Sequence, residues 1–434
     1  MSQKRHVKSR ERSIVPLAVA KDSPRLYALI VVSPRRGSPM KYVVVILDGA
    51  AGWPLPELDG RTTMQAASTP RLDSLAHEGR VGLARTVPQG EEPSSAAACT
   101  SILGYDPARD RVGRGAIEAA SMGITLGPDQ VALRINTVTI TDGVMTSYAA
   151  GHISTEESQA IAREVAATLD DDTFTLCPGI AYRHILVVTG HPELLDTEYT
   201  PPHDISDREV APHLMSGPGA ELLHDYVSRA RPLLLSSAVN RLRAEAGQHP
   251  VTDLWPFWPG AAPKSIIPFA EKRGISSAMT SGVDLLNGLA VLVGMDRLEI
   301  AGVTGDSNND YAAQAVGALA ALDDHDLVVI HVESPDEEGH AGDIEAKVAA
   351  IEAIDRDVMS RVIEYAAERE VRVLAMPDHP TPIPIKTHVG EPVPFLIWGP
   401  GIPSNGAEAF NEVDAGATGL LLDPGHEVMD ALIG

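Results

Sequence analysis

The sequence predicts an α/β fold: a mostly parallel sheet with helices on both faces, and a second, inserted α+β region. Short apolar runs such as Lys41–Leu47, Leu327–Val332 and Val371–Ala375 alternate with segments of helical spacing. Such continuous apolar runs, alternating with helical segments, are typical of parallel strands that are buried on both faces. The chain has 434 residues, which exceeds the size at which one hydrophobic core keeps growing, so we expect two domains.

Composition and charge narrow the classes of function. Hydrophobic residues make up 44% of the chain and charged residues 22%, as in ordinary globular proteins. The formal net charge of −24 argues against nucleic acid or an anionic membrane as a partner. No run approaches the ~20 apolar residues that span a bilayer. The two cysteines, Cys99 and Cys177, give no disulfide framework, so we expect a cytoplasmic protein. The sequence indicates no oligomeric state.

Residues 1–39 differ from the rest of the chain. They carry nine Lys/Arg against two Asp/Glu, with several prolines and no helical periodicity. A secretory signal needs a longer apolar stretch and a small-residue cleavage site. We expect a disordered basic tail, which an early start codon before Met40 explains; a targeting or binding arm is the alternative.

The first predicted strand, Lys41–Leu47, ends in Asp48-Gly49. Ligand sites of open α/β sheets lie outside the carboxyl ends of the strands, so Asp48 falls at the ligand edge. Thr69-Pro70 predicts a helix start, with Thr69 as the cap and Pro70 in the first position.

Ser94 and Ser95 stand before a small-residue run that favours a helix. A serine at a helix N-terminus lies beside unpaired backbone N–H groups and the positive end of the dipole. This position suits a nucleophile that accepts a phosphoryl group. The alternative is that either serine only caps the helix. Arg114 follows between two glycines that let the backbone approach a ligand.

Residues 126–263 predict an inserted α+β domain. Val131–Ile140 and Ala181–Val188 favour strands, Ser154 favours a helix cap ahead of a helix through Leu169, and the Pro-rich stretches Thr200–Asp204 and Trp255–Gly260 favour loops. A domain that closes over an anionic substrate needs cations, although each candidate also has a structural or exposed alternative. The candidates in this region are His152, Arg183, His184 and His203.

The core domain, residues 40–125 and 264–434, resumes its alternating pattern after the insertion. The expected elements are a helix over Val283–Leu292, a strand over Leu298–Val303, a helix over Asp310–Leu322, a long helix after Asp343 and a last strand, Phe395–Trp398. The apolar stripe of the long helix is interrupted only by Asp355.

Metal-ligand residues follow three of the predicted parallel strands. They are Asp48 after the first, Asp336 and His340 after Leu327–Val332, and Asp378 and His379 after Val371–Ala375, with His388 nine residues further on. The Asp336-His340 spacing alone is a weak signal, for which a solvated loop is the alternative. Parallel strands bring their carboxyl ends to one edge, so these residues can converge. Three carboxylates and three imidazoles suit two divalent ions such as Mn²⁺ or Zn²⁺ better than Mg²⁺ or Ca²⁺.

These motifs resemble the alkaline phosphatase superfamily and, within it, the cofactor-independent phosphoglycerate mutases of the archaeal type. The resemblance covers residues 40–434. It is carried by Ile46–Gly49, Ser101–Pro107 with Gly113–Gly115, Ala150–Glu157, Val332–Asp336 with His340, and Pro377–His379. The Gly-Tyr-Asp-Pro element within Ser101–Pro107 is particular to the mutases, whereas the metal ligands are shared by the superfamily.

The resemblance implies an alkaline-phosphatase-like fold and a two-metal site. One metal would bind Asp336, His340 and His388, and the other Asp48, Asp378 and His379. Ser95 would be a further ligand and the catalytic nucleophile. The ions would be Mn²⁺ first, with Zn²⁺, Co²⁺ or Mg²⁺ as alternatives. The expected reaction is the glycolytic interconversion of 3-phosphoglycerate and 2-phosphoglycerate through a phosphoserine, with the inserted domain covering this small phosphorylated substrate.

The sequence departs from the archaeal pattern near the nucleophile. Ala96 and Cys99 stand where archaeal members commonly carry Asp and His, and His152 stands where an Arg is often found. This leaves two alternatives on the same core, a metal-dependent phosphatase or a kinase of a small hydroxyl substrate such as homoserine, and beside them a non-catalytic binding protein. The candidate substrate-binding residues are Arg114, His152, Arg183 and Lys264.

Overall fold

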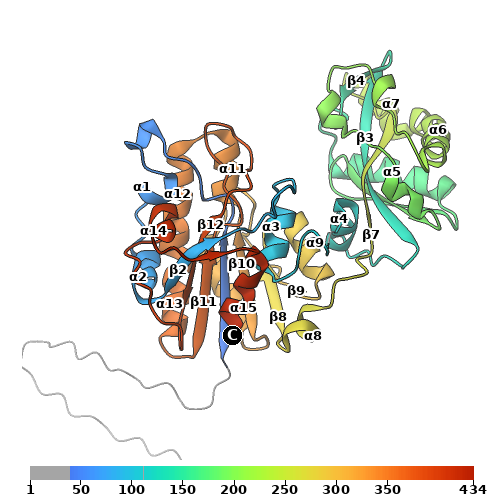
Figure 1. Ribbon diagram of the computed structural model, residues 1–434. Helices are drawn as coiled ribbons and strands as arrows, with labels where there is room; N and C mark the ends of the chain where they lie inside the picture. The colour runs from blue at the N-terminus through green and yellow to red at the C-terminus, as the bar shows by residue number, and fades with distance from the viewer. Residues whose placement is uncertain (1–39, 111) are drawn as a thin grey trace, which may run out of the picture.

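The computed structural model describes residues 40–110 and 112–434 (Figure 1). The tail predicted over residues 1–39 lies outside the described residues. None of the helices in the described residues is long and apolar enough to cross a membrane.

The first sheet has eight strands in the order β13-β2-β12-β11-β1-β10-β8-β9. Their bounds are β1 Lys41–Leu47, β2 Arg80–Ala84, β8 Ser277–Thr280, β9 Asp296–Arg297, β10 Leu327–Val332, β11 Val371–Met376, β12 Val393–Trp398 and β13 Leu421–Leu422. Strand β1 lies in the centre and pairs in parallel with β10 and β11, and β12 is antiparallel to both of its neighbours. The prediction of a largely parallel sheet is therefore confirmed.

Helices cover both faces of this sheet (Figure 1). On one side lie α1 (Thr63–Ala66), α2 (Pro70–Glu78), α12 (Ile344–Ala353), α13 (Ser360–Ala366) and α14 (Glu412–Ala417). On the other lie α3 (Ser95–Ile102), α9 (Asp284–Leu292) and α15 (Val428–Ile433). The central strands β1, β10 and β11 are aliphatic and almost fully buried, as a sheet covered on both faces requires.

A second sheet lies apart from the first and is antiparallel throughout (Figure 1). Its strands are β3 Gln130–Thr141, β4 Val144–Ser147, β5 Phe174–Cys177, β6 Arg183–Thr189 and β7 Asp253–Ala261. Helices α5 (Thr155–Leu169), α6 (Ala220–Ser236) and α7 (Ala238–Glu245) accompany it. Helix α4 (Arg114–Ser121) packs against α9 on one side and against β3 and β7 on the other, so it joins the two bodies.

One of the two Pro-rich stretches predicted as loops is a strand. The Pro-rich stretch Trp255–Gly260 is not a loop but part of β7, whose one partner strand in the described part of the chain is β3. An edge strand tolerates Pro256 and Pro259 because the missing N–H groups are not needed by a second neighbour. The other stretch predicted as a loop, Thr200–Asp204, contains a short 3-10 helix over Pro202–Ile205.

The strand predicted over Leu298–Val303 does not form. Strand β9 is only Asp296–Arg297, at the edge of the sheet. The chain then turns: the Val303 N–H donates to the Ile300 carbonyl at 3.3 Å, and Gly302 adopts a φ of +86°. The Ile300 side chain packs against Gly317 of α10 (Tyr311–Ala321). Ile300 of this run therefore packs against a helix instead of a neighbouring strand.

The start of α2 shows how an unexpected polar residue is used. Thr69 occupies the cap position but makes no side-chain cap hydrogen bond. Instead, Oδ1 of Asp355 accepts from the backbone N–H groups of Arg71 at 3.0 Å and Leu72 at 2.8 Å. The acid that interrupts the apolar stripe thus caps a helix 284 residues away in sequence.

Candidate active site and metal centre

The strand order brings the predicted ligands to one edge. Strands β11, β1 and β10 are neighbours and run in parallel, so their carboxyl ends lie side by side. Asp48 directly follows β1, and Asp378 and His379 follow β11 within three residues. Helix α11 (Ser334–Ala341) begins two residues after β10 and carries Asp336 and His340.

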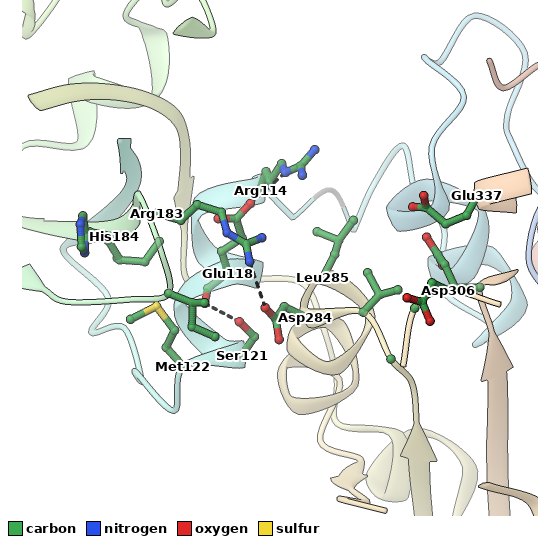
Figure 2. Close-up of a pocket in the computed structure, with 16 residues that line it drawn as sticks. Arg114, Glu118, Ser121, Met122, Arg183, His184, Asp284, Leu285, Asp306 and Glu337 are labelled. Atoms are coloured by element: carbon green, nitrogen blue, oxygen red, sulfur yellow. Dashed lines mark hydrogen bonds and ion pairs between the residues drawn. The ribbon is translucent and has the colours of Figure 1, made fainter. Parts of the chain in front are cut away.

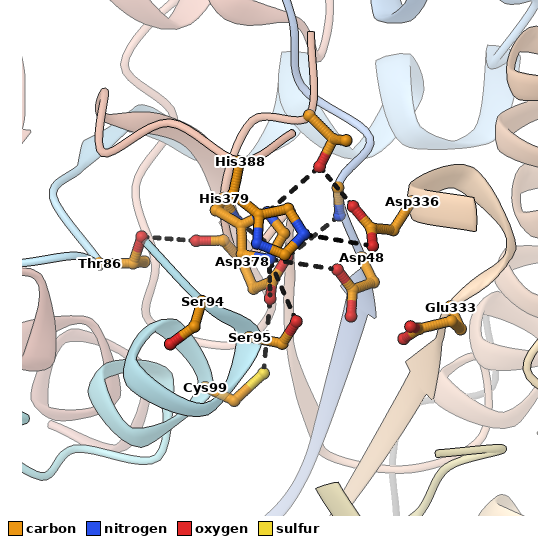
Figure 3. A network of polar contacts seen from close by, with 12 residues as sticks. Asp48, Thr86, Ser94, Ser95, Cys99, Glu333, Asp336, Asp378, His379 and His388 are labelled. Atoms are coloured by element: carbon orange, nitrogen blue, oxygen red, sulfur yellow. Dashed lines mark hydrogen bonds and ion pairs between the residues drawn. The ribbon is translucent and has the colours of Figure 1, made fainter. Parts of the chain in front are cut away.

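A first group of side chains surrounds Nε2 of His379 (Figure 3). This atom lies 3.2 Å from Oγ of Ser95, 3.3 Å from Oδ2 of Asp378 and 3.7 Å from Oδ1 of Asp48. Asp48, Asp378 and His379 are fully buried. Four atoms that can ligate a metal therefore face one small volume.

A second group surrounds Oδ2 of Asp336. This oxygen lies 3.1 Å from Nε2 of His340 and 3.5 Å from Nε2 of His388, and the two imidazole nitrogens are 2.9 Å apart. The rings of His379 and His388 lie 3.9 Å apart between centroids. The two groups are therefore adjacent and share one wall.

The surroundings of Asp48 fit a bound cation. Burial and then the carboxylates of Asp378, Glu333 and Asp336 raise the pKa of Asp48 well above its usual value. Its Oδ1 atom is buried and has no hydrogen-bond partner among the residues that the structure describes. Packed, buried carboxylates repel one another and lack solvation, and a divalent ion removes both penalties. Mixed carboxylate and imidazole donors suit a transition-metal ion.

In the second group, Asp336 and His340 stabilise each other in their charged forms. Burial alone would raise the pKa of Asp336, but hydrogen bonds from His340 and His388 hold it far below the usual value. The same contact raises the pKa of His340 to about 9. A divalent ion would replace the proton between these side chains, because metal ligands bind in their deprotonated forms.

A cleft of about 470 Å³ opens between the two bodies beside this edge (Figure 2). Glu333 and Glu337 line it from the first body, and Arg114, Glu118 and Arg183 line it from α4 and β6. Nε of Arg114 donates to Glu118 at 3.0 Å, and its guanidinium stacks 3.8 Å above the ring of Trp258. Arg183 lies 4.0 Å from Asp284. The cleft thus places two arginines opposite Glu333 and Glu337, which follow β10.

The other two predicted substrate residues lie elsewhere. His152 packs edge-on against Tyr148 and Tyr182, and Lys264 is exposed. Neither is among the described residues that line the cleft. The structure therefore brings Arg114 and Arg183 to the cleft but not His152 or Lys264.

Comparison with known proteins identifies the family. A family model described as 2,3-bisphosphoglycerate-independent phosphoglycerate mutase matches residues 76–240. A protein of that name from Methanothrix thermoacetophila is 44% identical over 397 residues, which cover 91% of this chain and 100% of the relative. The chain belongs to the 2,3-bisphosphoglycerate-independent phosphoglycerate mutase family. A probable mutase from Geobacter sulfurreducens is 39% identical, over 91% of this chain and 100% of its own length.

Solved structures agree with this assignment to the mutase family. The cofactor-independent phosphoglycerate mutase of Thermoplasma acidophilum aligns with a TM-score of 0.67 and 27% identity, over 91% of this chain and 99% of that chain. The PH0037 protein of Pyrococcus horikoshii aligns with a TM-score of 0.77 and 27% identity, over 91% and 96%. The likeness spans both bodies, because it covers nearly all of the chain.

In this mutase family member, Ser94 and Ser95 have different surroundings (Figure 3). Oγ of Ser94 accepts the Ala97 N–H at 3.3 Å and caps α3, whereas Oγ of Ser95 faces His379. The alternative weighed from sequence, a helix cap, therefore describes Ser94. Cys99, one turn further on, is buried with its Sγ 3.8 Å from Oδ2 of Asp378.

Sequence reasoning missed several polar residues at this edge. Nε2 of His331 lies 2.7 Å from Oδ2 of Asp48 and 3.7 Å from Oε2 of Glu333. An imidazole inside the otherwise apolar run Leu327–Val332 was the available signal, as was an acid directly after that strand. Thr381 and Lys347 are also fully buried here. Nothing in their local sequence separates them from ordinary loop and helix residues.

Proposed function

We propose that this chain interconverts 3-phosphoglycerate and 2-phosphoglycerate by phosphoryl transfer through Ser95. The observation that carries the proposal is the 3.2 Å contact between Oγ of Ser95 and Nε2 of His379, inside a buried set of carboxylates and imidazoles. Relatives that span nearly the same length bear the name of this mutase. Such an enzyme serves glycolysis, and the free Cys99 and Cys177 agree with a cytoplasmic location.

We assign two divalent ions, with Mn²⁺ as the first choice, to the two ligand groups. Asp48, Asp378, His379 and Ser95 would hold one, and Asp336, His340 and His388 the other. When bound, such ions neutralise phosphoryl oxygens and favour the ionised serine hydroxyl.

The chemistry divides into two transfers at one serine. Oγ of Ser95 forms a bond to phosphorus while the bond from phosphorus to the 3-oxygen of the substrate breaks, and the serine proton ends on that oxygen. The 2-hydroxyl of the bound glycerate then attacks the phosphoserine and returns its proton to Ser95. The N-terminus of α3 beside Ser95 favours the negative charge of both transfers. Positioning and charge neutralisation supply most of the catalysis in phosphoryl transfer.

We assign residues 126–263 to a domain that covers the substrate, and residues 40–125 and 264–434 to the catalytic domain. Arg114 and Arg183 face Glu333 and Glu337 across the cleft, so they suit the carboxylate and phosphate of a glycerate phosphate. Covering the cleft holds the glycerate while it reorients and keeps water from the phosphoserine. In this arrangement we assign no direct contact to His152 or Lys264.

The test is an enolase-coupled assay with 3-phosphoglycerate and Mn²⁺, with no 2,3-bisphosphoglycerate added. We expect phosphoenolpyruvate to form at a rate proportional to enzyme, and no formation with Ser95→Ala purified in the same way. Release of inorganic phosphate without phosphoenolpyruvate would establish a phosphatase instead, and ATP consumption with homoserine would establish a kinase. The names of the relatives favour neither.

A further inference from the structure

Lys347 of α12 is a fully buried lysine. Among the described residues, no carboxylate lies within salt-bridge distance of its Nζ atom. Burying an ammonium group costs folding free energy unless the group is paired with a carboxylate. A buried lysine without such a pair therefore suggests a functional role. The carboxylates that act on it from further away are Asp336, Glu412 and Asp48, two of which belong to the ligand groups.

The ammonium of Lys347 holds two ligand-bearing loops together. Its Nζ donates to the Thr381 carbonyl at 2.7 Å and to the Ala51 carbonyl at 3.4 Å. The Thr381 N–H also donates to the Ala51 carbonyl, at 3.0 Å. Ala51 belongs to the loop that follows Asp48, and Thr381 to the loop that follows His379. Lys347 therefore fixes the backbone behind both.

Thr381, which Lys347 holds in place, contacts one predicted ligand of each group. Its hydroxyl donates to Oδ1 of Asp336 and lies 3.3 Å from Nδ1 of His379. Because the single hydroxyl proton goes to Asp336, the hydroxyl accepts the Nδ1–H of His379. This tautomer leaves the lone pair of Nε2 free and aimed at Ser95 and Asp378.

Lys347 also places a positive charge behind the edge. Burial lowers its pKa to about 8, which still leaves the group charged at neutral pH. Glu412, which also acts on this charge, accepts hydrogen bonds from Oγ1 of Thr62 at 2.7 Å and from the Gly52 N–H at 3.0 Å. The charge of Lys347 thus favours the ionised, metal-binding form of the nearby carboxylates.

We propose that Lys347 is a positioning residue that sets the affinity of both ligand groups for divalent ions, by fixing Thr381 and through it Asp336 and His379. The inference rests on the proposed function, since it takes the two groups to be metal sites. Lys347 lies behind the ligands and does not touch the reacting atoms.

The test compares Mn²⁺ binding to metal-free wild type and variants by isothermal titration calorimetry, with electron paramagnetic resonance as a second readout. Lys347→Met keeps an unbranched side chain, one heavy atom shorter, and removes its charge and donors. We expect its Mn²⁺ dissociation constant to rise about 10- to 100-fold, as for other residues that orient metal ligands. Thr381→Val, which removes only the hydroxyl, should weaken binding in the same direction. Lys272→Met is the matched control, because Lys272 also donates to a backbone carbonyl, that of Gly104, away from this edge.

The outcomes separate the two proposals. A wild-type protein that binds no Mn²⁺ would overturn the proposed function, whereas unchanged affinity in a folded Lys347→Met would overturn only the role of Lys347. If Lys347→Met does not fold, Thr381→Val decides, and wild-type affinity there refutes the connection through Thr381. At saturating Mn²⁺ we expect the KM of Lys347→Met for 3-phosphoglycerate to stay within about twofold of wild type, since the cleft is untouched.

Discussion

Oγ of Ser95 lies 3.2 Å from Nε2 of His379, although 284 positions separate the two residues in sequence. The contact exists because α3 begins at the carboxyl end of β11, and Ser95 is the first residue of that helix. The neighbouring hydroxyl, that of Ser94, is already engaged by the Ala97 N–H. Adjacent serines therefore have separable roles, one chemical and one structural.

We expect Ser95→Ala to lower turnover by about 10⁴-fold or more, because it removes the atom that accepts the phosphoryl group. Ser94→Ala should keep most activity and lose about 1 kcal/mol of stability, the usual effect of removing a helix cap. The enolase-coupled assay, mass spectrometry of the phosphopeptide and urea denaturation measure these effects. An inactive Ser94→Ala with an active Ser95→Ala would assign the nucleophile to Ser94.

Removing metal should both inactivate and destabilise the protein. Without a cation, the buried carboxylates of Asp48 and Asp378 repel each other, so a chelator should lower the melting temperature. Mn²⁺ at a hundredfold excess over its dissociation constant should restore about 2.7 kcal/mol for each site. Elemental analysis should give two ions per chain. A melting temperature that does not respond to chelator or to Mn²⁺ would contradict metal binding at this edge.

The lining of the cleft predicts which positively charged side chain affects substrate binding. Arg114→Gln should raise the KM for 3-phosphoglycerate about tenfold or more, because a charge-assisted contact to the substrate is lost. Lys264→Gln is the control, since Lys264 is exposed and does not line the cleft. Steady-state kinetics at saturating Mn²⁺ measure both. Equal KM values for Arg114→Gln and wild type would place the substrate elsewhere.

The sequence was sufficient to predict the central strands and the residues at their ends. Strands β1 and β10 have the predicted bounds, because a continuous aliphatic run has few alternatives to a buried strand. Asp48, Asp336 and Asp378 converge because parallel neighbours end at one edge.

The residues that the sequence concealed depend on contacts across the fold. Lys347 has the helical spacing of its neighbours, and only the loops packed against α12 make it a buried donor. Asp355 interrupts an apolar stripe for a reason that lies in α2. Strand β7 carries prolines that predict a loop, and only its place at the edge of the second sheet permits them. The sequence around a residue does not show partners that are distant in the chain.

The cap that Asp355 provides to α2 predicts a stability effect far from the active site. Asp355→Ala leaves the N–H groups of Arg71 and Leu72 without an acceptor in a buried setting, and we expect a loss of about 1–3 kcal/mol. Asp355→Asn keeps an oxygen acceptor and should lose less. Guanidinium denaturation measures both, with Asp357→Ala as a control near wild type, because the half-buried Asp357 carboxylate pairs with the exposed side chain of its neighbour Arg356. A wild-type midpoint for Asp355→Ala would show that Thr69 takes over the cap.

His184 predicts a pH dependence of stability that is independent of the metal ligands. Its Nδ1 accepts the Gly179 N–H at 3.0 Å, so Nε2 carries the proton and donates to Oγ of Ser158 at 2.8 Å. Burial, and then the nearby Arg134, lower the pKa of His184 to about 4. A second proton at Nδ1 would break the bond to Gly179. The folded state therefore holds the neutral imidazole.

The sign of the effect follows from the lowered pKa. Between pH of about 6.5 and 4, His184 binds a proton in the unfolded chain but stays neutral in the folded chain. The free energy of unfolding therefore falls as pH falls. The stabilisation is complete above about pH 6.5, and its loss reaches up to about 3 kcal/mol at pH 4. We expect His184→Gln to be less stable at neutral pH but to show a shallower decline in acid. Urea unfolding of chelated protein from pH 8 to 4 measures the slope, and exposed His77→Gln, which should follow wild type, is the control. Parallel curves for wild type and His184→Gln would mean that His184 accepts its second proton within the folded state, with Gly179 and Ser158 rearranging around it.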